Sequence, residues 1–339
     1  MSGTSLSASN VPELEPKTIE MGGSSFISSV IFLADGSYIV GGGFEGKLRR
    51  WRADDGQEVG EPMNVGDSIL SVTASRDGRW IVNGTESGQV IVWDAENHSK
   101  VKQFEGHPFF QPVEVVDVSP DGTKIATGSH DLTACVWSFS TGERVLGPLH
   151  HDYALAVVKY SHDGRLLATA TCERRSIRIY DSQDGHLFVD IPVEVDVVDR
   201  SLAWSDNNKY LFALSDGSIK RLDVSTGIIL SQWLIHSSTD PKGITLATNG
   251  RFIAAAADTT VSFWDTTTEK QIGPVIEHAD VLFSMAISPN YDLVTSGVKS
   301  IVLRRSLREI LPSHYCDNVS VFTSKTSREK WFPDSVLTY

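Results

Sequence analysis

Cysteine is scarce in this sequence, since only Cys135, Cys172 and Cys316 carry a thiol among 339 residues. No two of them form a C-x-x-C pair and their number is odd. Both features argue against a disulfide framework and against a structural zinc site. We therefore expect no metal ion and no cofactor.

Basic residues are also few: 30 Lys and Arg stand against 43 Asp and Glu, a net charge of −13. Nucleic-acid binding and docking on anionic membranes both need surplus positive charge. No apolar run reaches the ~18 residues of a membrane helix, and no apolar core of a signal peptide follows Met1. These absences predict a cytoplasmic or nuclear protein that binds neither nucleic acid nor membranes.

Catalytic motifs are missing as well, because neither G-x-S-x-G nor H-E-x-x-H occurs. Gly41–Gly46 reads GGGFEG, but the strand-like run KLRRW follows it, whereas a dinucleotide-binding loop opens a helix. His150-His151-Asp152 has no partner set for a metal. The sequence therefore predicts a protein that is not an enzyme.

A turn dipeptide recurs along the chain at a period of about 42 residues. It is strongest at Asp35-Gly36, Asp77-Gly78, Asp121-Gly122 and Asp163-Gly164, and weaker at Asn207-Asn208, Asn249-Gly250 and Asn290-Tyr291. Asp, Asn and Gly tolerate positive φ and close tight hairpins. The series predicts seven equivalent hairpins.

Each turn lies between short β-branched runs that are typical of strands, for example VVDVS before and KIATG after Asp121-Gly122. A third run and a looser fourth run follow in every repeat. Four strands per period of 40 to 45 residues are typical of a propeller blade. The predicted fold is all-β, a seven-bladed β-propeller over residues 17–306 with four antiparallel strands per blade.

The ends of the third runs carry a resemblance to a known family. They read Trp51-Arg52, Trp93-Asp94, Trp137-Ser138, Tyr180-Asp181, Leu222-Asp223, Trp264-Asp265 and Arg305-Ser306. This pattern resembles the WD-repeat (WD40, β-transducin-like) family, and repeat 3 matches it best, with Gly106-His107 and Ser119–Gly122. The repeats are divergent and also resemble the WD arrays of fungal proteins.

The resemblance implies a structural set of hydrogen-bonded residues within a blade. In repeat 3 the matching positions are His107, Thr127, Asp131 and Trp137. Repeat 6 offers His236, Asp258 and Trp264, but Ala replaces the hydroxyl residue. A buried polar group needs a partner, so we expect these residues to stabilise blades rather than to bind a ligand.

Two strands are candidates for closing the ring. Residues 17–20 align with the outer strand of a blade, and residues 309–313 offer a competing closure. Residues 1–16 contain Ser and Pro and are expected to be disordered. Residues 307–339 do not match the repeat, and their apolar content predicts an extension that packs on the ring.

The resemblance implies a non-catalytic scaffold that binds a peptide or protein partner on one face of the ring. This loop face carries the loops before each first strand and the hairpins between second and third strands. An alternative is a propeller that binds a small ligand or a glycan between blades or in the central channel. The candidate partner-binding residues are aromatic, charged or polar: Phe44, Glu86, Phe109, Phe110, His130, Tyr153, Arg174 and Arg175.

Overall fold

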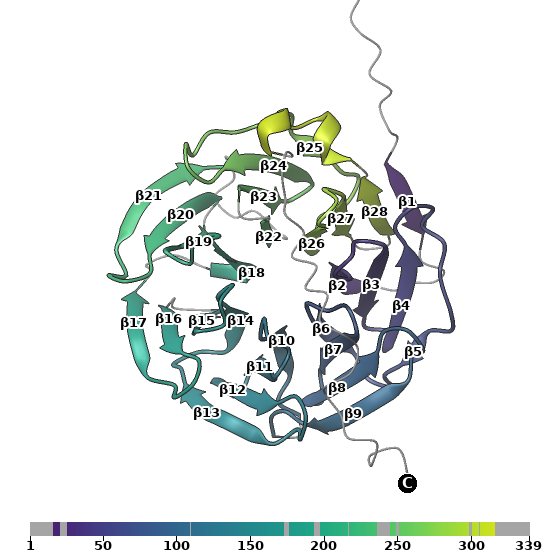
Figure 1. Cartoon of the computed structure of the whole chain (residues 1–339), viewed down its shortest axis with the longest axis vertical. Coiled ribbons are helices and arrows are strands. Elements are labelled where there is room, and N and C mark those ends of the chain that lie inside the picture. The colour runs from purple at the N-terminus through teal and green to yellow at the C-terminus, as the bar shows by residue number, and fades with distance from the viewer. Residues whose placement is uncertain are drawn as a thin grey trace, which may run out of the picture.

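Seven four-stranded antiparallel sheets stand around a central axis in the computed structural model of the chain (Figure 1). The predicted seven-bladed β-propeller is therefore confirmed. The structure describes residues 16–20, 26–108, 110–172, 176–192, 197–215, 217–235, 245–248, 251–297, 300–304 and 306–315. Within these residues the only helices are two three-residue 3₁₀ turns, and neither could cross a membrane.

The strands of each blade follow one another from the axis to the rim. Blade 1 contains β2 (Ile27–Phe32), β3 (Tyr38–Gly43), β4 (Lys47–Arg52) and β5 (Met63–Asn64). Blade 2 contains β6 (Ile69–Ala74), β7 (Trp80–Thr85), β8 (Gln89–Asp94) and β9 (Lys100–Glu105). Blade 3 contains β10 (Val113–Val118), β11 (Lys124–Ser129), β12 (Thr133–Ser138) and β13 (Arg144–His150). Blade 4 contains β14 (Leu155–Tyr160), β15 (Leu166–Thr171), β16 (Ser176–Asp181) and β17 (Leu187–Pro192).

The remaining blades repeat this order, with one exception at the end of the chain. Blade 5 contains β18 (Val197–Trp204), β19 (Tyr210–Ser215), β20 (Ser218–Asp223) and β21 (Ile229–Leu234). Blade 6 contains β22 (Thr245–Thr248), β23 (Phe252–Ala257), β24 (Thr260–Asp265) and β25 (Ile276–Glu277). Blade 7 contains β26 (Ser284–Ile287), β27 (Leu293–Ser296) and β28 (Ser300–Arg304), and its outer strand is β1 (Lys17–Glu20).

The turn dipeptides join the first and second strands of their blades. In blade 3 Gly122 has a φ of +70°, and the Asp121 carboxylate accepts the amide of Thr123 at 3.0 Å. The Ser119 hydroxyl closes the same turn, because it accepts the amide of Lys124 at 2.9 Å. In blade 5, whose first turn contains no glycine, Asn208 takes the positive φ of 56°. Asn tolerates this region, so the weaker turn keeps the same shape.

The apolar core is divided into clusters, several of which lie between neighbouring blades. The cluster between blades 1 and 2 joins Val40 and Leu48 of one sheet to Ile69, Ile81 and Trp93 of the next. All five side chains are buried. Burying such a side chain contributes about 1.5–3 kcal/mol. Each sheet is therefore stable only between two others, as in other repeat architectures.

The N-terminal strand closes the ring. β1 pairs antiparallel with β28, and Lys17 lies opposite Leu303 while Glu20 lies opposite Ser300. Ile19 is buried in the cluster that joins blade 7 to blade 1. The closure expected from residues 17–20 is thus confirmed, and the competing closure through residues 309–313 is wrong. Those residues include parts of 3₁₀ turns, a conformation that cannot continue a strand ladder.

The segment after the last strand packs on blade 6. It contains two 3₁₀ turns, η1 (Leu307–Glu309) and η2 (Ser313–Tyr315). Leu307 and Tyr315 from these turns, and Leu311 between them, are buried in the core cluster that joins blade 6 to blade 7. The Tyr315 hydroxyl donates to the Asp265 carboxylate. The outer strand β25 of blade 6 is only two residues long, so this segment covers apolar surface that a full strand would cover elsewhere. Residues 1–15 and 316–339 lie outside the described part of the chain.

The closure predicts a difference between two neighbouring residues of β1. Ile19→Ala should lower the free energy of unfolding by about 2–4 kcal/mol, because it leaves a cavity at the joint between blades 7 and 1. Thr18→Ala changes an exposed side chain of the same strand and should stay within about 0.5 kcal/mol. Urea denaturation followed by circular dichroism measures both. Equal small effects would show that β1 is dispensable for stability.

Candidate interaction face

The loop face is a continuous arc of hairpins and loops from blade 1 to blade 4. Backbone bonds join each hairpin to the next loop: Val65 to Gly46 (2.9 Å), Glu86 to Ser68 (3.0 Å), Phe110 to Ser87 (3.2 Å), His130 to Pro112 (3.2 Å) and His151 to Leu132 (2.8 Å). The first residue of each pair donates its N–H to the carbonyl of the second. These bonds hold the loops at fixed distances, so side chains that are far apart in the sequence form one surface.

Three aromatic rings gather at one end of the arc, where blade 7 meets blade 1. The rings of Phe26 and Phe44 stack at 4.9 Å with 17° between their planes, and Phe283 packs edge-on against Phe26 at 4.4 Å. Phe44 remains 57% exposed. The sequence pointed to Phe44 alone. Phe26 and Phe283 each directly precede the first strand of their blade. The other repeats share no aromatic residue at this position, so the repeat pattern did not mark these two.

A glycine makes this cluster possible. A Cβ on Gly43 would lie 1.7 Å from the carbonyl oxygen of Phe26, which no side chain could occupy. The hairpin can therefore approach the backbone of Phe26, and the amide of Phe44 donates to that carbonyl at 3.3 Å. The glycines of the GGGFEG motif thus serve hairpin packing, and the motif leads from strand β3 to strand β4.

A second exposed aromatic, Phe110, lies at the tip of the loop between blades 2 and 3. It is 74% exposed and has a positive φ of 65°, a conformation that is uncommon for a bulky residue. Three carbonyl oxygens, of His107, Pro108 and Gln111, would contact a Cβ on Gly88 at 2.9–3.1 Å. The loop is therefore wrapped over Gly88, which turns Phe110 toward solvent.

The other candidate partner-binding residues are spread over the same arc. Glu86 is exposed on the hairpin of blade 2, and the amide of its neighbour Ser87 donates to Asp67 at 2.9 Å. His130 lies on the hairpin of blade 3 and pairs with Glu114 at 3.1 Å. Tyr153 is half-buried in the loop before blade 4. Phe109, Arg174 and Arg175 lie outside the described residues.

Carboxylates give the described part of the arc an acidic character. Partial burial alone would raise the pKa of Asp67, but hydrogen bonds from Ser87, Thr85 and Ser68 outweigh it and hold that pKa below its ordinary value. Asp67 is therefore ionised at neutral pH. Asp152 is exposed at the far end of the arc and pairs with Arg178 at 2.9 Å.

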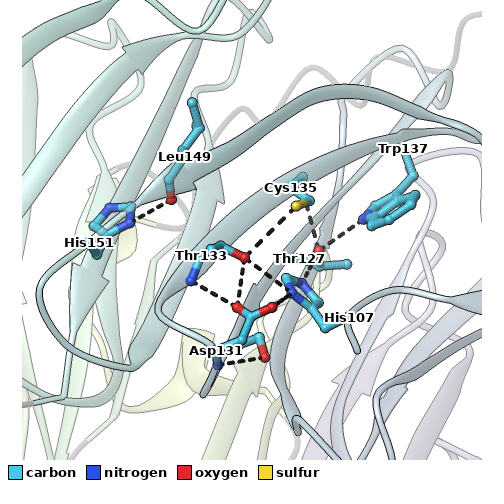
Figure 2. A network of polar contacts seen from close by, with 9 residues as sticks. His107, Thr127, Asp131, Thr133, Cys135, Trp137, Leu149 and His151 are labelled. Carbon is cyan, nitrogen blue, oxygen red and sulfur yellow. Dashed lines mark hydrogen bonds and ion pairs between the residues drawn. The ribbon is translucent and has the colours of Figure 1, made fainter. Parts of the chain in front are cut away.

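Directly beneath the arc, blade 3 contains a chain of hydrogen bonds (Figure 2). The indole N–H of Trp137 donates to the Thr127 hydroxyl at 2.9 Å, and that hydroxyl lies 2.8 Å from His107 Nε2. His107 Nδ1 lies 2.8 Å from the Asp131 carboxylate, which can only accept. The series of donors and acceptors thus runs from Trp137 to Thr127, then to His107 and finally to Asp131.

The Asp131 carboxylate ends this chain as an anion. Partial burial would raise its pKa, but the bonds from His107 and Thr133 outweigh this and hold the pKa below its ordinary value. Every polar side-chain atom of these four hydrogen-bonded residues has a partner, and His107 and Thr127 are buried. The arrangement ties the third strand of the blade to the hairpin of the loop face.

Other blades contain shorter series of hydrogen bonds at the equivalent place, formed by different residues. In blade 4 His151 Nε2 contacts the Thr169 hydroxyl at 2.9 Å and the Tyr180 hydroxyl at 3.3 Å, and its Nδ1 donates to the Leu149 carbonyl at 3.0 Å. In blade 2 the Trp93 indole donates to Asn83 at 2.8 Å. The sequence had indicated only that His150-His151-Asp152 lacks a partner set for a metal, and it did not pair His151 with Thr169 and Tyr180.

Blade 6 shows how the loss of the hydroxyl residue is compensated. The Trp264 indole donates to the Ser262 hydroxyl at 2.7 Å, two residues earlier in the same strand. Asp258 lies in the hairpin between β23 and β24 with a φ of 54°, and its carbonyl accepts the amide of Leu282 at 2.9 Å. His236 lies outside the described residues.

The first strands surround a central channel of about 530 Å³. Its lining combines small residues with larger ones such as Tyr160, His162 and Trp204, and it includes an ion pair between Lys159 and Asp117 at 3.2 Å. Within the described residues no group of three or more His, Cys, Asp or Glu side chains could hold a metal ion.

Comparisons with known proteins agree with this architecture. The family described as WD domain, G-beta repeat matches residues 61–94 and 98–138, which run from the outer strand of blade 1 to the third strand of blade 3. The predicted resemblance to the WD-repeat family is thereby confirmed.

Curated relatives can be aligned with half of this chain or less. Eukaryotic translation initiation factor 3 subunit I of Neurospora crassa is 29% identical over 194 residues, 51% of this chain and 53% of the relative. The protein of the same name from Pyricularia oryzae is 30% identical over 50% of this chain and 52% of its own length. Protein groucho of Drosophila melanogaster is 27% identical over 38% of this chain and 17% of its own length. The chain thus spans about half the length of the first two relatives.

The bonded chain of blade 3 predicts the effect of removing its central hydroxyl. Thr127→Val keeps the shape of the side chain but leaves the Trp137 indole N–H and the Nε2 atom of His107 without partners. It should therefore lower the free energy of unfolding by about 2–4 kcal/mol. Thr123→Val, an exposed threonine of the same blade, is the control and should cost under about 1 kcal/mol. Urea denaturation followed by tryptophan fluorescence measures both. Similar values for the two variants would contradict a stabilising role.

Blade 4 predicts a dependence of stability on pH. Burial, together with the nearby Arg178, lowers the pKa of His151 from 6.5 to about 4, so the folded state favours the neutral ring. The unfolded state then binds more protons between these values, and stability falls as the pH drops through them. The loss due to His151 should be about 2 kcal/mol between about pH 7.5 and pH 5. His151→Gln should remove this part of the pH dependence of the free energy of unfolding.

His150→Gln is the matched control for this measurement, because His150 is the exposed neighbour of His151. It should leave the pH profile unchanged. A profile that is the same in wild type and in His151→Gln would show that His151 does not titrate in this range.

Proposed function

We propose that this WD-repeat propeller is a non-catalytic scaffold that binds a protein or peptide partner on its loop face. The observation that carries the proposal is the exposure of Phe44 and Phe110 on loops that hydrogen bonds hold in place. Large apolar side chains on a rigid surface are typical of binding sites, because they bury much area at little cost in entropy. Phe110 also holds a strained backbone conformation, which is most often found at functional sites.

The charges of the arc favour a partner with basic residues beside an apolar anchor. Asp67, Glu86 and Asp152 lie along it, and the whole chain carries a net charge of −13. Complementary charges mainly raise the association rate and select the partner, while the aromatic contacts supply most of the affinity. Binding should therefore weaken only moderately at high salt.

The relatives support a role in an assembly. The name of two of them, subunit I of Eukaryotic translation initiation factor 3, describes a component of a larger complex. By analogy we propose that this chain works in the cytoplasm as a component that binds other proteins. The described residues that form hydrogen-bonded chains are buried in the blades, which supports a structural role for them and a non-catalytic one for the protein.

The proposal predicts that the aromatic side chains of the loop face are needed for capture of partners. A tagged chain with Phe44→Ala and Phe110→Ala should recover its partners from native extract at least about tenfold less than wild type. Phe188→Ala is the control, since Phe188 is 53% exposed but lies on the outer strand β17, at the rim. Quantitative mass spectrometry measures recovery.

Equal recovery by wild type and both variants would show that the loop face is not the binding surface. Recovery of no protein by any of them, together with binding to a glycan array, would favour the small-ligand or glycan alternative. Circular dichroism should first show that the double variant keeps the β-propeller spectrum.

A further inference from the structure

The turns between the first and second strands form the end of the ring opposite the loop face, which we call the turn face. The residue directly before each turn dipeptide occupies an equivalent place in every blade. The seventh member of this set, Asp206 in blade 5, is exposed. The other six line the central channel, and they are Ala34, Arg76, Pro120, His162, Thr248 and Pro289. These positions therefore surround the mouth of the channel at the turn face.

The cavity of about 530 Å³ belongs to this end of the channel. Its lining begins in the middle of the first strands, at Ser29 in blade 1 and Ser71 in blade 2, and continues to the turns. None of the described candidate residues of the loop face contributes to it. Pockets for small ligands have volumes of about 300–1,000 Å³. A small molecule can therefore enter at the turn face while a partner occupies the loop face.

The charged side chains of the lining favour an anion. Arg76 is exposed at the mouth, and within the described residues it has no ion pair. Among the described residues of the lining, Asp117 is the only carboxylate. It is buried in the wall, where it accepts the backbone amide of Tyr160 at 2.8 Å and the Lys159 ammonium at 3.2 Å. The Lys159 side chain is still 48% exposed, so its other N–H groups can reach a ligand.

His162 adds a group that can become a cation. Its Nε2 lies 3.4 Å from the carbonyl oxygen of Trp204, which can only accept, so Nε2 carries the proton. Nδ1 then has no hydrogen-bond partner among the residues that the structure describes. Burial lowers the pKa of His162, and the nearby cations Arg76 and Lys159 add to this, whereas Asp206 opposes it. The influence of Arg76 and Lys159 on this pKa places both cations close to the ring.

We propose that the mouth of the channel at the turn face binds a small dianion of the phosphate type, held by Arg76, Lys159 and His162. The guanidinium fork and the ammonium point charge are common partners of phosphate oxygens, and a protonated imidazole can donate to them as well. Arg76 of blade 2 and His162 of blade 4 flank Pro120 of blade 3, which carries no charge. The cations therefore lie on two sides of an uncharged place in which the anion fits.

The carboxylates around the mouth limit the size of this ligand. Asp77 and Asp121 each directly follow a residue of the mouth and bond to their own turns. They accept the amide of Arg79 at 3.1 Å and that of Thr123 at 3.0 Å. An acidic protein segment lying across the turn face would meet these anions, and like charges repel. A compact dianion inside the mouth meets the cations first, so the arrangement favours a small molecule over an acidic peptide.

Isothermal titration calorimetry with sodium sulfate tests the site. Arg76→Gln removes the cation that has no ion pair, so it should raise the sulfate dissociation constant at least about fivefold. Arg165→Gln is the matched control, because Arg165 lies in the turn of blade 4, does not line the channel and has a side chain that is 81% exposed. It removes the same charge from the same face and should change the constant less than about twofold.

Asp206→Asn provides a test that a folding defect cannot imitate. Asp206 is the exposed carboxylate at the seventh position of the mouth, close enough to His162 to act on its pKa. Removing it takes away a repulsion, so the sulfate dissociation constant should fall about two- to threefold. Asp184→Asn is the control, since Asp184 is an exposed carboxylate between the outer strands β16 and β17. It should leave the constant unchanged.

The pH dependence of sulfate binding tests the role of His162, because sulfate stays a dianion throughout. An anion at Nδ1 raises the pKa of His162, so the complex takes up a proton and the affinity rises as the pH falls. Between about pH 8 and about pH 6 the affinity of the wild type should rise at least about threefold. His162→Gln should remove most of this rise, which a purely structural role of the ring would not predict.

Two phosphate probes distinguish the sources of the anion. Inorganic phosphate and glucose 6-phosphate are both largely dianions at about pH 8. Tighter binding of the ester would show that the cavity also holds the remainder of a phosphorylated small molecule. Equal binding would assign the site to the free anion. Both results agree with the proposed dianion site.

Several outcomes would overturn the proposal. They are the absence of sulfate binding, an equal loss of affinity in Arg76→Gln and Arg165→Gln, and an affinity that Asp206→Asn does not improve. An acidic peptide that binds at the turn face without competition from sulfate would refute a small-anion site. None of these results bears on the loop face, whose test uses residues that do not line the cavity.

Discussion

The packing of each sheet between two others is the interaction on which the rest of this molecule depends. A four-stranded sheet of this size cannot bury both faces alone, and a linear stack would leave the first and last sheets half exposed. The ring removes this problem only when it is closed, which makes the pairing of β1 with β28 a condition for the whole arrangement. Residues 17–20 and 300–304 are distant in the chain and adjacent in the fold.

Stability is distributed unevenly around the ring. Blade 3 has a complete hydrogen-bonded chain from Trp137 to Asp131, and blade 4 builds a partial one from His151, Thr169 and Tyr180. Blade 6 has a two-residue outer strand, and the segment of residues 307–315 covers its core instead. Divergence of the repeats has therefore changed how each blade is held together without changing the number of blades.

The proposed binding surface follows from the same architecture. Loops that must connect adjacent blades are tied to one another by backbone bonds, so they form a rigid face on which Phe44 and Phe110 stay exposed. Outer strands must each end a sheet, so every blade has an edge that needs protection.

The sequence by itself determined the number of blades and the positions of the turns, and it narrowed the closing strand to two candidates. Each of these depends on local chemistry repeated in phase: Asp-Gly turns, alternation within short strands, and the spacing of Trp51, Trp93 and Trp137. The interaction of Phe26 and Phe283 with Phe44, and the contacts of His151 with Thr169 and Tyr180, were decided only by the tertiary structure. These features depend on which residues the ring brings together. They have no local signal, because they are set by contacts between segments that are far apart in the chain.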